Sequence, residues 1–135
     1  MNPVVLPPGE TELRSAKRSV RRELGISDKA IVFGFIGQIV PVKGVLELLE
    51  AVGGLPPEMD WKLLIAGKDP HDGAPYETNC RERVHQLGIE SKVRFLGFLD
   101  DVQPFYHAID VAVVPSLEEP LGRIPLEAAA YSRPS

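Results

Sequence analysis

A repeated alternation of apolar runs with helix-forming segments constrains the fold of this chain more than any other feature. Four apolar runs are predicted as strands, at 30–37 (AIVFGFIG), 60–67 (DWKLLIAG), 92–99 (KVRFLGFL) and 110–115 (DVAVVP). The segments that follow them are predicted as helices, at 43–55, 75–88, 100–109 and 121–132. Such runs are typical of strands buried on both faces, and strands alternating with helices are typical of parallel sheets. We therefore predict an α/β, Rossmann-like fold, a doubly wound parallel sheet with helices on both faces.

Residues 1–24 precede this alternation and are predicted as an extended lead-in and an amphipathic helix that begins at residue 11 and ends before Gly25. The basic face of this helix carries Arg14, Lys17, Arg18, Arg21 and Arg22. We expect that face to be exposed to solvent, and the alternative is a role at a membrane surface. Residues 25–135 are predicted as one α/β domain, incomplete at its C-terminus.

Charge and cysteine content exclude several classes of protein. The net charge of −4 argues against a domain built to bind nucleic acid. The single cysteine, Cys80, cannot form an internal disulfide, and we expect it to be a packing or surface residue. The histidines, His71, His85 and His107, lack the spacing of metal ligands, so no metal site is predicted.

The sequence shows no targeting or membrane-spanning pattern. The N-terminal stretch MNPVVLPPGE lacks the basic and apolar regions of a signal peptide, and no window approaches the roughly 20 apolar residues of a membrane span. We expect a cytoplasmic protein, with attachment to the inner face of a membrane as the alternative.

Topology predicts where a ligand binds. Ligands of doubly wound sheets bind beyond the carboxyl ends of the strands, where the strand order reverses. With a strand order of 3-2-1-4, the reversal lies between the first and fourth strands, so the loops 37–44 and 115–123 face each other.

The loop 37–44, GQIVPVKG, contains neither a Walker A motif nor the dinucleotide-binding glycine pattern. Lys43 lies at the predicted start of a helix, where an ammonium beside free backbone N–H groups can bind phosphate. The alternative is that Lys43 is a solvated lysine.

The stretch EPLGRIPLE, 119–127, joins the fourth strand to the fourth helix. Gly122 lets a ligand approach the backbone, and the N–H groups of Gly122, Arg123 and Ile124 are suited to a diphosphate. Glu127, about one turn into the helix, can accept both hydroxyls of a ribose. The alternative is an ion pair between Glu127 and Arg123.

Five elements in order, GxxxPxKG, LLIAG, VRFLGFL, DVAVVPS and EEPLGRIPLEAAA, resemble the nucleotide-sugar half of retaining GT-B glycosyltransferases of the sucrose-synthase and glycogen-synthase type. The resemblance covers residues 25–135, and the pair Glu119 and Glu127 is its most specific part. It implies transfer of a sugar from a nucleoside-diphosphate sugar with retention of anomeric configuration and without an essential metal. The acceptor, a carbohydrate or lipid-linked glycan, is then bound by an N-terminal domain that this chain lacks.

The resemblance also implies roles for individual residues. Lys43, which stabilises the leaving diphosphate, and Glu119, beside the donor sugar, are the implied catalytic residues. The residues implied in donor binding are Gly37, Gln38, Phe98, Leu99, Gly122, Arg123, Ile124 and Glu127. Among them, Phe98 and Leu99 contact the base, the amides of 122–124 hold the diphosphate, and Glu127 binds the ribose diol.

This sequence departs from the family pattern at two points. Gln38 stands where the family usually has an arginine, so a positive charge is missing unless Arg123 or another cation supplies it. The chain also stops at Ser135, before the last strand of the family fold, and we expect it to transfer no sugar alone. Gln38 motivates an alternative, a non-catalytic nucleotide-binding or protein-interaction domain. A flavodoxin-like signalling domain is disfavoured, because clustered acids are missing after the first strand.

Overall fold

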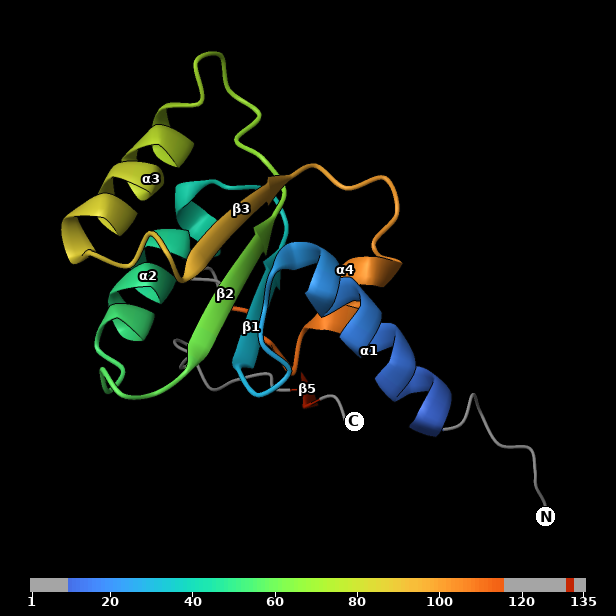
Figure 1. Cartoon of the computed structure of the whole chain (residues 1–135). Helices are drawn as coiled ribbons and strands as arrows, with labels where there is room; N and C mark the ends of the chain where they lie inside the picture. The colour runs from blue at the N-terminus through green and yellow to red at the C-terminus, as the bar shows by residue number, and fades with distance from the viewer. Residues whose placement is uncertain (1–9, 116–130, 133–135) are drawn as a thin grey trace.

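The computed structural model describes residues 10–115 and 131–132, and its elements follow the predicted alternation (Figure 1). The helices are α1 (Glu10–Leu24), α2 (Val45–Gly53), α3 (Pro75–Leu87) and α4 (Gln103–Ala108), with a 3-10 turn, η1, at Pro41–Lys43. The strands are β1 (Ile31–Ile36), β2 (Trp61–Ala66), β3 (Val93–Gly97), β4 (Val111–Ala112) and β5 (Tyr131–Ser132).

The strands form one sheet in the order β3-β2-β1-β4-β5, which agrees with the hypothesis of a 3-2-1-4 order. β1 pairs in parallel with β2 from Ile31 opposite Trp61 to Ile36 opposite Ala66. β2 pairs in parallel with β3, and β1 with β4. The carboxyl ends of β1, β2 and β3 therefore lie together at one end of the sheet (Figure 1).

The C-terminal end of the fold corrects one prediction. Residues 121–132 were expected to form a helix, but Tyr131–Ser132 are a strand that pairs antiparallel with β4. Backbone hydrogen bonds to the exposed edge of β4 determine the conformation of these two residues. This pairing overrides the helical pattern of the preceding sequence. Residues 121–130 lie outside the described residues.

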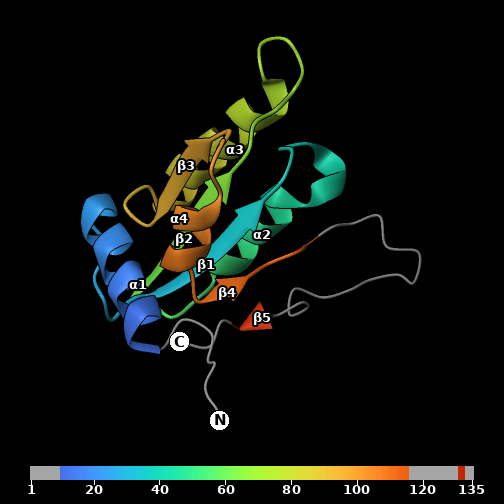
Figure 2. The same ribbon diagram turned by 90° about the vertical axis from the view of Figure 1, so that its right-hand side faces the viewer.

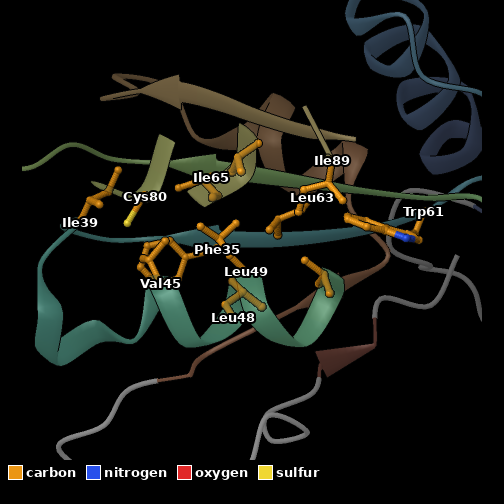
Figure 3. Packing of buried hydrophobic residues seen from close by; sticks show 12 residues of the cluster. Phe35, Ile39, Val45, Leu48, Leu49, Trp61, Leu63, Ile65, Cys80 and Ile89 are labelled. Carbon is orange, nitrogen blue, oxygen red and sulfur yellow. The ribbon is translucent and has the colours of Figure 1, made fainter. Parts of the chain in front are cut away.

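Helices cover both faces of the sheet, as predicted. Side chains of β1 and β2 alternate between two clusters, so that Phe35, Leu63 and Ile65 pack under α2 and α3 (Figure 3). Val32 and Leu64 face the opposite side, where α1 and α4 lie. β1 and β2 are thus buried on both faces, which explains their continuous apolar runs in the sequence.

A buried arginine fixes α1 to the sheet. The side chain of Arg21 is only 1% exposed. Its guanidinium donates to the carbonyl oxygens of Ala108 (3.0 Å) and Ala30 (3.1 Å), as well as to those of two residues between α1 and β1. It also pairs with a carboxylate oxygen of Asp110 at 2.8 Å. The prediction that the whole basic face is solvated is therefore wrong for Arg21.

Asp110 completes this network at the start of β4. Its carboxylate accepts hydrogen bonds from the Lys17 ammonium, the backbone N–H of Val32 and the Arg21 guanidinium. Partial burial acts to raise the pKa of Asp110, but these three hydrogen bonds outweigh it and lower the pKa below its ordinary value of 3.8. The ionised carboxylate thus joins α1, β1 and β4 at one point.

Replacing Arg21 with alanine should lower the free energy of unfolding by about 3 kcal/mol, because it leaves buried carbonyl groups without their donor and removes one of the three donors to Asp110. Arg22 is the matched control, since it is on the same helix and exposed, and Arg22→Ala should change stability by no more than about 0.5 kcal/mol. Urea denaturation of both variants measures the difference. Equal effects would contradict the anchoring role of Arg21.

Candidate functional site

The ends of β1, β2 and β3 are joined backbone to backbone. The N–H of Gly37 donates to the carbonyl of Ala66 (3.0 Å), and the N–H of Gly67 donates to that of Gly97 (2.8 Å). Gly67 has a φ of +130°, and a Cβ built there would lie 1.8 Å from the carbonyl oxygen of Gly37. Only glycine tolerates both conditions. The three strand ends therefore form one rigid rim.

This rim borders a pocket of about 400 Å³. The lining residues are Ile36, Gly37, Gln38, Ala66, Gly67, Lys68, Pro70, Phe98, Leu99 and Val102. Three apolar side chains of the pocket are well exposed. Their exposed fractions are 69% for Phe98, 39% for Ile36 and 36% for Val102. The volume is in the range of small-molecule sites, and exposed apolar side chains grouped around a hollow mark a surface that a ligand can cover.

A buried carboxylate shapes the loop that forms one wall of the pocket. Asp69 is 6% exposed and accepts hydrogen bonds from the backbone N–H groups of His71 (3.0 Å), Tyr76 (2.9 Å) and Glu77 (3.2 Å). Glu77 in return accepts from the N–H of Asp69 (3.2 Å), a reciprocal arrangement like a capping box at the start of α3. The hydrogen bond from His71 is the main cause that lowers the pKa of Asp69 below its ordinary value of 3.8.

Neither Asp69 nor its neighbour Lys68 was predicted from the sequence as a site residue. The available signal was an acid after a strand, followed eight residues later by Glu77 in the first turn of a predicted helix. That pattern indicates a cap as readily as a ligand site.

The structure brings together four of the predicted site residues. Gly37, Gln38, Phe98 and Leu99 come from the loops after β1 and β3, and all four line the one pocket. Gln38 is exposed on its wall. These residues are 60 positions apart in the sequence, and the parallel order β3-β2-β1 is what places them at the same edge.

Lys43 is not among the residues that line this pocket. It ends the turn η1 instead of opening a helix, and α2 starts only after Gly44, which has a φ of +79°. A Cβ on Gly44 would lie 2.4 Å from the carbonyl oxygen of Pro115. The loop after β1 therefore meets the chain that leaves β4, as the topology predicted (Figure 2). Glu119, Gly122, Arg123, Ile124 and Glu127 lie outside the described residues.

Cys80 and the histidines are not among the residues that line the pocket. Cys80 is fully buried, and burial raises the pKa of its thiol to about 12, which leaves it protonated and unreactive at neutral pH. Within residues 10–115, no group of three or more His, Cys, Asp or Glu side chains is placed to hold a metal ion. None of the helices described is both long and apolar enough to cross a lipid bilayer.

Comparison with known proteins identifies the family. The family model for glycosyl transferases group 1 matches residues 16–135. This chain belongs to the glycosyl transferases group 1 family. A relative in that comparison, the D-inositol 3-phosphate glycosyltransferase of Corynebacterium glutamicum, is 34% identical over 142 aligned residues. The alignment covers 97% of this chain and 34% of the relative, so the chain spans about a third of the length of that enzyme.

Solved glycosyltransferase structures share the fold of this group 1 domain. The crystal structure of Anabaena Alr3699/HepE in complex with UDP and glucose matches with a TM-score of 0.67 and 26% identity, over 76% of this chain and 27% of that one. The C-terminal domain of a glycosyl transferase group 1 family protein, LpcC from Francisella tularensis, matches with a TM-score of 0.66 and 25% identity, over 76% of this chain and 54% of that one. The Rossmann-like half of a GT-B glycosyltransferase is thus the fold of this chain.

Replacing Gly67 with alanine should lower the free energy of unfolding by about 3 kcal/mol, because the new methyl group overlaps the backbone of Gly37. Gly73 is the matched control, since its φ of +77° is also positive but nothing lies within 4 Å of a Cβ built there. Gly73→Ala should cost about 1 kcal/mol. Chemical denaturation compares the two, and equal losses would show that the rim can relax.

Proposed function

We propose that residues 25–135 are the donor-binding domain of a retaining glycosyltransferase of the glycogen-synthase and sucrose-synthase type, and that the donor is a UDP-sugar. The observation that carries the proposal is the pocket at the carboxyl ends of β1–β3, lined by Gly37, Gln38, Phe98 and Leu99. Family membership supports it, and so does the similarity to a glycosyltransferase solved with UDP and glucose.

The pocket suits the base of a nucleotide. A pyrimidine or purine ring has two apolar faces and a polar edge, and the exposed side chains of Phe98 and Val102 offer apolar area to such a ring. The backbone of Gly37 and Gly67 also borders the pocket. The hydrogen bonds that join the strand ends hold this backbone in place. In the proposal, the base lies against Phe98 and Leu99.

The proposal places the diphosphate and sugar toward the contact between Gly44 and Pro115, where the loops after β1 and β4 meet. There Lys43 and the amides of 122–124 offset the charge of the leaving diphosphate. Glu127 binds the ribose diol, and Glu119 lies beside the donor sugar. In this scheme cations and amides neutralise the leaving group, and no essential metal is required.

The acceptor, proposed to be a carbohydrate or a lipid-linked glycan, binds to a domain outside this chain. The chain spans about a third of the length of the Corynebacterium relative, so about two thirds of a protein of that length would lie outside it. We propose that the whole protein works in the cytoplasm or at the inner face of a membrane, and that the present chain alone transfers no sugar. A second candidate is a nucleotide-binding domain without catalysis, and the neutral Gln38 on the pocket wall is the observation that favours it.

Calorimetric titration with UDP, GDP and ADP in parallel tests the donor proposal. UDP should bind saturably and more tightly than the other two, and Glu127→Ala should weaken UDP binding by about tenfold or more through loss of charge-assisted hydrogen bonds. Glu118→Ala is the matched control and should bind like the wild type. A folded chain that binds none of the three nucleotides would contradict the proposal. Turnover in the presence of acceptors would contradict the expected inactivity of the chain alone.

A further inference from the structure

Among the described residues that line the pocket, one carries a charged side chain, and it is Lys68. Apart from Lys68 and Gln38, the described lining consists of glycines and apolar residues. Lys68 comes directly after Gly67, between the strand ends that carry Gln38 and Phe98. A positive charge therefore lies beside an apolar hollow, an arrangement that favours a ligand with both a flat apolar part and an anionic part.

The main chain at Lys68 is fixed from both sides. Its carbonyl accepts a hydrogen bond from the N–H of Ile39 (3.0 Å), which ties it to the loop after β1. The next residue, Asp69, is buried and makes the reciprocal hydrogen bonds with the start of α3. The side chain of Lys68 itself is exposed. The fold thus positions this residue on the pocket wall and leaves its ammonium accessible.

No acid neutralises this ammonium within the part of the chain that the structure describes. Some other cations of the fold have carboxylate partners, such as Lys17 with Asp110 and Arg83 with Glu50. Lys68 makes no such pair with any of the described residues, and the carboxylate of neighbouring Asp69 is engaged by backbone N–H groups. An ammonium without a carboxylate partner is available to an anionic ligand.

We infer that Lys68 is a specificity-determining residue that binds the phosphate nearest the nucleoside, on the side of the base pocket, and supplies the positive charge that Gln38 does not. The inference rests on the proposed function and adds a residue to that site. Lys68 would then discriminate nucleoside diphosphates from nucleosides, while the apolar lining binds the base in both. A lysine acts here as a point charge, so an arginine can replace it in part.

Affinities for UDP and uridine, measured on the full chain by ligand-observed NMR and calorimetry, test the inference. Lys68→Gln should weaken UDP binding about three- to tenfold, a modest loss because the charge is exposed. Uridine binding should stay unchanged, and Lys68→Arg should keep most of the UDP affinity. Lys29→Gln removes the same charge from an exposed position before β1, at the opposite end of the strands, and is the matched control. Added salt should weaken UDP binding of the wild type more steeply than that of Lys68→Gln.

Two results would overturn the inference and leave the proposed function intact. One is a Lys68→Gln variant that binds UDP as tightly as the wild type. The other is an equal loss of UDP and uridine affinity, which would mean that Lys68 acts through the shape of the pocket. A wild-type chain that is folded and binds no UDP would overturn the proposed function together with this inference.

Discussion

The close approach of two backbone segments, where β1 and β2 end, is the constraint on which the site depends. The carbonyl of Gly37 occupies the space in which any side chain at position 67 would begin, and the hydrogen bonds of Gly37 and Gly67 continue the sheet into the loops. A rim built this way needs no ligand to hold its shape. The pocket walls that carry Gln38, Lys68 and Phe98 are consequently set by the backbone, so binding costs little conformational entropy in these loops.

A second set of interactions fixes α1 and β4 relative to β1 and so relative to that rim. Arg21 and Asp110 connect α1, β1 and β4 at the opposite end of the strands, so β4 is fixed where it starts. From there β4 runs beside β1 and delivers Pro115 against Gly44. The ion pair at one end of the sheet thus fixes the start of β4. The chain then follows β4 to the proposed diphosphate region at the other end.

The sequence predicted the four parallel strands, because burial on both faces leaves continuous apolar runs. It also predicted that Gly37, Gln38, Phe98 and Leu99, which follow the strands, lie at the same end of the sheet. The order 3-2-1-4 was only a hypothesis, and the structure agrees with it. The burial of Arg21 was not predicted. Helical periodicity indicates the direction in which a side chain points, but not the carbonyl groups to which it donates hydrogen bonds. Asp69 was missed for a related reason. Asp69 and Glu77 lie eight residues apart across a strand-to-helix turn and form a cap for α3. Glu119 and Glu127 have the same spacing in the sequence. Spacing alone therefore does not distinguish a capping pair from a ligand-binding pair.

NMR of the 15N-labelled chain during titration with UDP would show whether the pocket at the ends of β1–β3 binds the base of a nucleotide. We expect saturating amide shifts to concentrate at residues 36–38, 67–70 and 98–102, which surround the pocket. The chemical shifts of amides before β1 and in α1, at the far end of the strands, should not change. Saturating shifts confined to another face of the domain, with the pocket amides unmoved, would contradict the account.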